Sequence, residues 1–170
     1  MKRPTQLILC AAALSAAAAW GAEMTVNARL KGFQEVPSVS TQATGRFSAK
    51  LDERGGTITY ELSYDGLEGE VRQSHIHVGQ RHVNGGISVF LCQTALNPDP
   101  TGLAPQCPQS GTVRGVLQPA NVFGPVGQGV APMEFGELLE AIRAGVAYAN
   151  VHSSTFPAGE IRGQLREHED

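Results

Sequence analysis

Short stretches in which apolar and polar residues alternate recur along most of the chain, and they limit its possible folds more than any other feature. Because successive side chains of a β-strand point to opposite faces, each stretch predicts a strand with one buried face. Two of them, 43–51 and 58–64, flank the turn sequence DERGG and predict a β-hairpin over 43–64. Further strands are expected at 24–30, 71–78, 86–92, 111–117, 146–152 and 159–166.

One segment departs from this two-residue period. Apolar residues between Met133 and Ile142 recur near helical spacing, Pro132 precedes them and Gly145 follows, so a short helix is predicted near 134–144. Seven or eight strands with one short helix predict an all-β fold, an antiparallel, Greek-key-like β-sandwich. The 20 glycines and 10 prolines suit the many turns of such a fold. We expect one domain, over residues 23–170.

The first 22 residues have the pattern of an export signal. Two basic residues precede an apolar run from Leu7 to Ala19, and small residues at the end predict cleavage after Gly21 or Ala22. The run is shorter than the ~20 residues that a transmembrane helix needs. We therefore expect a periplasmic or secreted protein whose mature chain has no transmembrane anchor.

Cleavage removes Cys10 and leaves Cys92 and Cys107 in the mature chain. An even pair of cysteines in an exported protein predicts a disulfide. The intervening segment QTALNPDPTGLAPQ predicts a long loop, whose closure stabilises the fold by roughly 3 kcal/mol in the chain-entropy account. The alternative is a pair of free thiols that bind a metal, which the wide spacing and the loop composition disfavour.

The charge balance bears on the class of partner. The chain has 13 Lys and Arg against 16 Asp and Glu, a net charge of −3. Such a chain lacks the basic surface with which proteins hold nucleic acid, so no nucleic-acid partner is expected. No nucleophile elbow, phosphate loop or dinucleotide fingerprint is found either, so the sequence assigns no enzyme class.

The histidines give the sharpest functional signal. In QSHIHVG (73–79), His75 and His77 share one face of the predicted strand, and Ile76 shares the opposite, core face with Val78. In AYANVHS (147–153), His152 likewise lies opposite a set of small apolar residues. If the two strands are neighbours, three imidazoles meet on one surface. Neutral imidazoles suit copper or zinc and leave an open coordination position.

Two other histidines complete the set. His82, in the glycine-rich sequence GQRHVNGG, is a candidate fourth ligand, whereas His168 lies in the charged tail EHED and is expected in solvent. The alternative to a metal site is a hydrogen-bonded surface pair at His75 and His77. The chain would then be a non-catalytic extracytoplasmic binding or adhesion module with structural histidines.

Two acidic residues have both a functional and a local interpretation. Glu35, in FQEVPSV, either orients or contacts a ligand or caps a strand end locally. Glu160, in GEIRGQL, either orients a histidine or forms an ion pair with Arg162 on the sheet face. The residues favour the local interpretation in both cases.

Four of these motifs together resemble a CHRD domain, the module named from chordin and also found in many bacterial secreted proteins. They are LKGFQEVPSV (30–39), ITYELSYDGLEG (58–69), SHIHVGQRHVNGG (74–86) and YANVHSSTFPAGEIRGQL (148–165). The resemblance spans about residues 24–166 and implies a β-sandwich. It implies little about function, although chordin itself is a secreted growth-factor antagonist.

A second resemblance is to the copper–zinc superoxide dismutases, which are sandwiches with His-x-His on one strand and Val-His on another. His75, His77 and His152 match that copper-ligand pattern. The sequence has no clear zinc-ligand loop, and only His82 stands near the place of a bridging histidine. The resemblance therefore implies copper rather than zinc as the metal, without implying the dismutase activity.

Overall fold

A computed structural model describes residues 24–167, so the predicted export signal and His168 lie outside the described residues. The described residues form nine strands, one α-helix and three short 3-10 helices. In chain order these are β1 (Met24–Lys31), η1 (Gly32–Gln34), β2 (Thr44–Asp52), β3 (Thr57–Asp65), β4 (Val71–Val78), β5 (Gly86–Cys92), β6 (Gly111–Leu117), η2 (Pro119–Asn121), η3 (Val126–Gln128), α1 (Phe135–Arg143), β7 (Ala147–Ser153), β8 (Ile161–Gln164) and β9 (Arg166–Glu167).

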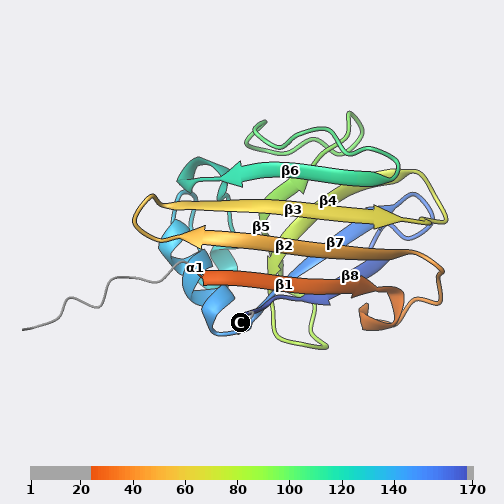
Figure 1. Cartoon of the computed structure of the whole chain (residues 1–170), viewed down its shortest axis with the longest axis horizontal. Helices are drawn as coiled ribbons and strands as arrows, with labels where there is room; N and C mark the ends of the chain where they lie inside the picture. The colour runs from red at the N-terminus through yellow and green to blue at the C-terminus, as the bar shows by residue number, and fades with distance from the viewer. Residues whose placement is uncertain (1–23, 168–170) are drawn as a thin grey trace, which may run out of the picture.

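The strands form a single antiparallel sheet that folds over on itself. Its order is β5-β4-β7-β8-β1-β2-β3-β6, and the short β9 pairs with β1. Figure 1 shows β1, β2, β3 and β6 as the front layer, with β4, β5, β7 and β8 crossing behind it. The predicted all-β, sandwich-like fold with one short helix is confirmed.

Alternation in the sequence translates directly into the two faces of the front layer. In β3, and in β2 from Phe47 onward, every second residue is buried, and the partners Phe47 and Leu62 are 1% and 0% exposed. Burying such a side chain contributes about 1.5–3 kcal/mol to folding. Helix α1 adds Leu138 and Ile142 to this core. Most of the predicted strand and helix bounds agree with the structure to within a residue or two.

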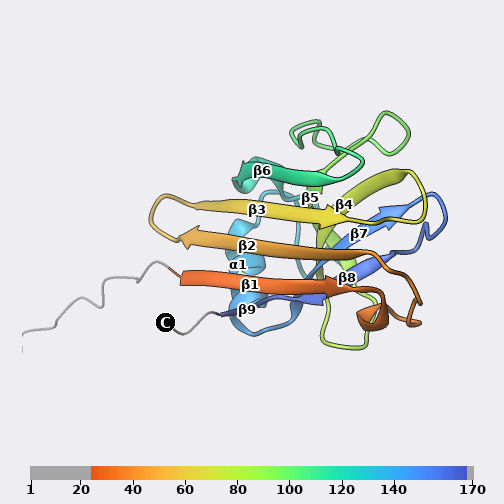
Figure 2. The same cartoon turned by 45° about the vertical axis from the view of Figure 1, so that its right-hand side comes forward.

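The last predicted strand, 159–166, is the exception. It is divided into β8 and β9 at Leu165, which is fully buried and donates its N–H to the carbonyl oxygen of Ala147 at 2.9 Å. Strand β8 pairs with both β7 and β1, whereas β9 pairs with β1, where Val26 faces Glu167. Figure 2 shows β9 beside β1, so the chain enters and leaves the domain on neighbouring strands.

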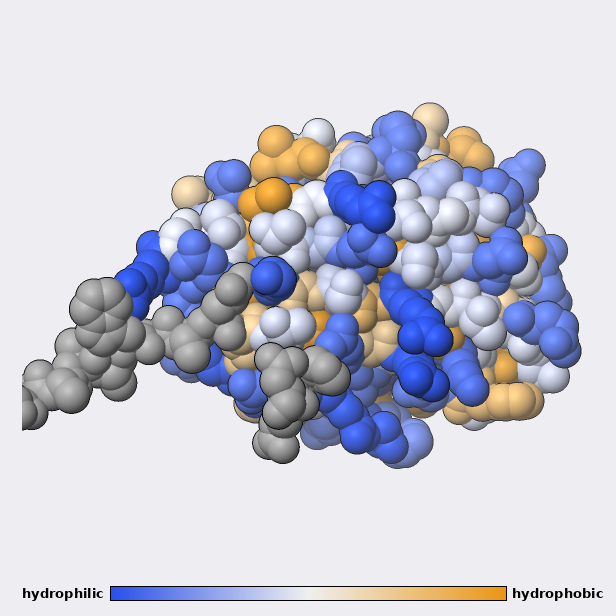
Figure 3. Space-filling view, viewed as in Figure 1, coloured by the Kyte–Doolittle hydropathy of each residue, from blue (hydrophilic) through white to orange (hydrophobic). Residues whose placement is uncertain are grey.

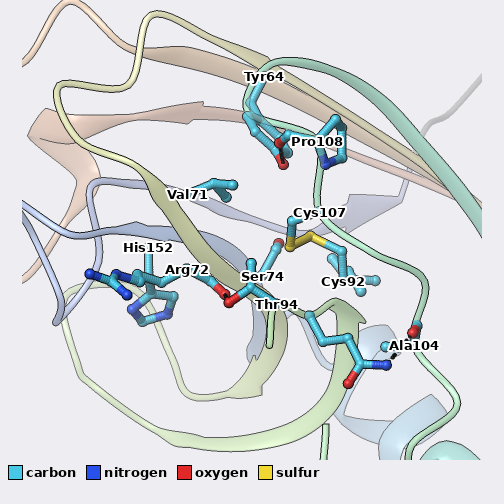
Figure 4. The surroundings of a disulfide bond; sticks show 12 residues. Tyr64, Val71, Arg72, Ser74, Cys92, Thr94, Ala104, Cys107, Pro108 and His152 are labelled. Atoms are coloured by element: carbon cyan, nitrogen blue, oxygen red, sulfur yellow. Dashed lines mark hydrogen bonds between the residues drawn. A yellow bond between two sulfur atoms is a disulfide. The ribbon is translucent and has the colours of Figure 1, made fainter. Parts of the chain in front are cut away.

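Cys92 and Cys107 form the predicted disulfide, with their Cα atoms 5.0 Å apart. The bond joins the end of β5 to the segment that leads into β6, and β5 and β6 are the two outer strands in the sheet order. Figure 4 shows its surroundings, where the Thr94 hydroxyl donates to the carbonyl of Arg72. Within the bridged loop, the buried Asp99 carboxylate accepts hydrogen bonds from three backbone N–H groups, which order the loop.

Within residues 24–167, helix α1 is too short and too polar to cross a lipid bilayer.

Candidate metal centre

Two neighbouring strands, β4 and β7, carry the three candidate ligands. His75 faces Asn150 across the ladder, and His152 faces Gln73. His75 and His77 lie on the face of β4 opposite Ile76, which belongs to the hydrophobic core. The condition set by the sequence, that the two strands be neighbours, is therefore met, although they are more than 70 residues apart in the chain.

The three imidazoles converge. Each residue offers a ring nitrogen such that all three nitrogens lie within 4.8 Å of one another. The Nδ1 atom of His75 is 3.2 Å from Nε2 of His152. The ring centroids of His75 and His77 are 5.3 Å apart, and those of His77 and His152 are 6.1 Å apart. One ion placed between the rings would be within reach of all three.

The site is buried, which the sequence did not predict. His75, His77 and His152 are only 0%, 7% and 6% exposed. The reason is that two loops fold back over this face of β4 and β7. The loop after β4 brings the carbonyl of Gly85 to His77, and the loop after β7 brings the carbonyl of Pro157 to His152.

These two carbonyls fix the tautomers of the rings that they contact. Nδ1 of His77 is 2.9 Å from the Gly85 oxygen, and Nδ1 of His152 is 3.0 Å from the Pro157 oxygen. Because a carbonyl only accepts, both Nδ1 atoms carry the proton, so Nε2 of His77 keeps a free lone pair, whereas Nε2 of His152 accepts the hydrogen bond from Nδ1 of His75. Nε2 of His77 and Nε2 of His75 are buried without a hydrogen-bond partner.

Burial also keeps the rings uncharged. Loss of solvation lowers the pKa of His77 and of His152 to about 4, and the backbone hydrogen bonds offset this only in part. The pKa of His75 is lowered well below its usual value by burial and by the neighbouring imidazoles. Neutral imidazole is the form that binds a metal ion, so the group is ready to bind at neutral pH.

An aromatic and cationic stack supports the same group. The Tyr148 ring lies parallel to His77, with the centroids 4.6 Å apart, and the guanidinium of Arg162 lies 3.4 Å from the Tyr148 centroid. Arg162 also donates to the carbonyls of Gln80 and Val83 in the covering loop. This arginine therefore holds the loop whose Gly85 carbonyl orients His77.

Glu35 lies next to this stack rather than against a histidine. It is 6% exposed and accepts a hydrogen bond from the Asn150 side chain at 2.5 Å. Burial raises the pKa of Glu35 to about 8, although Arg162 and the Asn150 hydrogen bond act in the opposite direction. Asn150 faces His75 across the ladder, so Glu35 lies near the histidine group, but its side-chain hydrogen-bond partner is Asn150 and not an imidazole.

Glu160 occupies neither of its predicted environments. Its buried carboxylate accepts hydrogen bonds from the Thr41 hydroxyl at 2.8 Å and from the Glu68 N–H at 2.9 Å, so it ties two loops together. The predicted sheet-face ion pair with Arg162 is wrong, because the Arg162 side chain binds the loop carbonyls and Tyr148 instead.

His82 does not join the other histidines. It is exposed at the tip of the covering loop, in a left-handed backbone conformation with φ 64°. The group of potential metal ligands among the described residues contains His75, His77 and His152 without it. The structure therefore gives three histidine ligands and does not bring the predicted fourth to them.

Sequence reasoning missed the side chains that frame the histidines. Tyr148 and Asn150 alternate with small apolar residues on the same strand as His152, so all three share its polar face. That alternation was the available signal, because it places Tyr148 and Asn150 on the same strand face as His152.

The sequence profile of the CHRD domain matches residues 26–165. The chain belongs to the CHRD domain family. The matched range spans the sandwich from β1 to the end of β8 and includes all three histidines of the candidate centre. No curated protein matches this CHRD protein.

Proposed function

We propose that this CHRD protein binds one transition-metal ion, copper in preference to zinc, through His75, His77 and His152. The observation that supports the proposal is the convergence of three buried, neutral imidazoles, two of which have an Nε2 atom with no hydrogen-bond partner. An unsatisfied buried polar atom costs about 1–3 kcal/mol. A bound cation would offset this cost, because it accepts the lone pairs.

The nature of the donors favours copper. Three imidazole nitrogens form a site for which the usual order of divalent ions places Cu(II) above Zn(II). The superoxide dismutase-like pattern of the same three residues agrees with copper. His77 and His152 would bind through Nε2, since the carbonyls of Gly85 and Pro157 hold their Nδ1 protons.

Three protein ligands leave a coordination position open. Bound copper would supply one-electron redox chemistry or a binding position for a small exogenous ligand. The chain itself orients the imidazoles, keeps them uncharged and shields them from bulk water by the two covering loops. These properties suit storage or transfer of copper without requiring catalysis.

We also infer that the protein acts outside the cytoplasm. The disulfide between Cys92 and Cys107 suits an oxidising compartment, where such bonds persist. The signal pattern of residues 1–22 supports the same location. Copper in such a compartment is accessible to a secreted or periplasmic domain.

Calorimetric titration of chelator-treated mature protein with Cu(II) and with Zn(II) at neutral pH tests the metal site. We expect one site per chain and tighter binding of Cu(II). His77→Ala and His152→Ala should each weaken Cu(II) binding severely, because an incomplete set of ligands remains. His82→Ala is the matched control, since that exposed histidine lies outside the group.

A paramagnetic resonance spectrum of the Cu(II) protein provides a second readout, because nitrogen couplings should be lost in His77→Ala and in His152→Ala but kept in His82→Ala. The unfolding curves of all variants are recorded to show that the fold is retained. If His152→Ala binds copper as well as the parent does, the three-histidine site is wrong. The histidines are then structural, and the chain is better described as a binding or adhesion module.

A further inference from the structure

A second feature lies on the outer face of the front layer, away from the histidines. A groove of about 630 Å³ crosses β1, β2 and β3 and continues to β9. Figure 3 shows this face of the molecule, with strongly hydrophilic side chains over the C-terminal half of β1. Four arginines, here called the arginine track, line the groove: Arg29, Arg46, Arg81 and Arg166.

The groove continues into a second hollow. This hollow has a volume of about 550 Å³ and shares Arg29, Arg46 and Ser63 with the first. Its lining adds two charged residues, Lys31 and Asp65. The two hollows thus form one elongated depression, with the pair Arg29 and Arg46 at the junction. Such a shape suits a linear ligand better than a compact one.

The pair at the junction is unfavourable for the fold alone. Arg29 and Arg46 are direct partners across the β1–β2 ladder, where like charges destabilise a sheet. Among the described residues, neither has an ion-pair partner. The nearby Glu61 does not neutralise them, because its carboxylate is bound by Arg114 at 2.7 Å. Glu167 and Asp65 also line the hollows, but the cationic residues outnumber the acidic ones, so a chain with a net charge of −3 places excess positive charge along one groove.

The rest of the lining indicates which anion fits. Asn27, Gln34, Ser48, Ser63 and Gln164 also line the groove. The Gln34 amide donates one hydrogen bond to a backbone carbonyl and the Gln164 amide donates two, which leaves their carbonyl oxygens as acceptors for a ligand. Amides and hydroxyls both donate and accept, as the recognition of a hydroxylated ligand requires. Guanidinium groups bind carboxylates in a bidentate manner. The lining thus combines partners for carboxylates with partners for hydroxyl groups.

Other macromolecules fit this groove less well. The aromatic residues among its described lining, Phe47 and Tyr64, are only 1% and 2% exposed, so they offer no ring on which nucleic-acid bases stack. Strands β1, β2 and β3 are all paired on both sides, so they leave no free edge to which an extended peptide adds.

We propose that the arginine track binds a linear acidic polysaccharide whose carboxylates contact the guanidinium groups and whose hydroxyls contact the amides and serines of the lining. This interaction is independent of the metal site, since none of the three histidines lines either hollow. It would hold an exported CHRD protein on a carboxylated matrix.

Calorimetry with oligogalacturonate in 50 mM salt tests the proposal. Salt screens the attraction between charges, over ~10 Å at 0.1 M, so the titration is made at low salt. We expect binding that weakens as salt rises. The double variant Arg29→Gln with Arg46→Gln should raise the dissociation constant at least about tenfold, as two bidentate contacts are lost. A matched control is Arg54→Gln with Arg72→Gln, which removes the same charge outside both hollows.

Two further measurements separate charge from structure. Arg29→Lys with Arg46→Lys keeps the charge without the planar fork, so it should restore binding only in part. The unfolding temperature of the glutamine double variant should equal or exceed that of the parent, because a like-charge pair is removed.

The choice of probe decides the class of ligand. The methyl-esterified oligogalacturonate keeps the sugar and loses the charge, and it should bind at least about tenfold more weakly. The proposal is overturned if oligogalacturonate does not bind, if the ester binds equally well, or if the glutamine double variant binds like the parent. Tighter binding of polyglutamate or of duplex DNA than of oligogalacturonate also overturns it.

Discussion

Glu35→Gln tests whether the carboxyl group beside Asn150 keeps its proton when the protein folds. In the unfolded chain Glu35 ionises near its ordinary pKa of 4.5, whereas burial raises the pKa to about 8 in the folded protein. Between these values the folded state binds one more proton than the unfolded state. Folding stability therefore falls as pH rises, because the sign of the slope follows the difference in bound protons.

The size of the effect follows from the pKa difference. Each unit corresponds to 1.36 kcal/mol, so the full change from pH 4.5 to pH 8 is about 5 kcal/mol, which is comparable with the total stability of many domains. Glutamine does not titrate, and its amide still accepts from Asn150. The difference in free energy of unfolding, parent minus Glu35→Gln, should thus fall by about 1.4 kcal/mol per pH unit between pH 5 and pH 8.

Denaturant unfolding of chelator-treated protein at pH 5, 6, 7 and 8 measures this difference. The titration of the buried histidines is common to both proteins and cancels. Glu137→Gln is the control, because Glu137 is exposed on α1 and its replacement should leave the slope unchanged. A difference that does not vary with pH would mean that Glu35 is ionised in the folded protein, with Arg162 outweighing burial.

Three further outcomes are expected. Thiol titration of denatured, unreduced protein should find no free thiol, and joint replacement of Cys92 and Cys107 by serine should lower the free energy of unfolding by roughly 3 kcal/mol; two reactive thiols would contradict the bond. Gly85→Ala should weaken Cu(II) binding at least about tenfold by calorimetry, because an added Cβ would overlap the β4 backbone and displace the carbonyl that orients His77. Gly127→Ala is the control and should bind Cu(II) normally, because a Cβ at Gly127 meets no atom. N-terminal sequencing of exported protein should begin directly after the predicted signal, and an intact Met1 would show that it is not cleaved.

The elements were predictable because their pattern is local. Burial of one face of β2 and β3 follows from the two-residue period, and the same period places His75 and His77 on one side of β4. The adjacency of β4 and β7 is not local, since it depends on how the whole sheet folds over. From the sequence, the adjacency of β4 and β7 could therefore be given only as a condition for His152 to lie near His75 and His77.

The depth of the site was not predictable for a different reason. The loops that cover the histidines show no periodic pattern, and their contacts are made by backbone carbonyls, which every residue carries. The same reason explains the error at Glu160. Its spacing from Arg162 suggested an ion pair, but the partners of Glu160 are a hydroxyl and an N–H from distant loops.

The pairing of β9 with β1 has a consequence for how this domain combines with others. Val26 faces Glu167 across that ladder, so the chain enters and leaves the domain at one place on its surface. Domains with adjacent ends tolerate insertion into a surface loop of a host protein. The segment from β1 to β9 is therefore suited to transplantation as a unit, which would carry the histidine centre into a host without separating the two halves of the host chain.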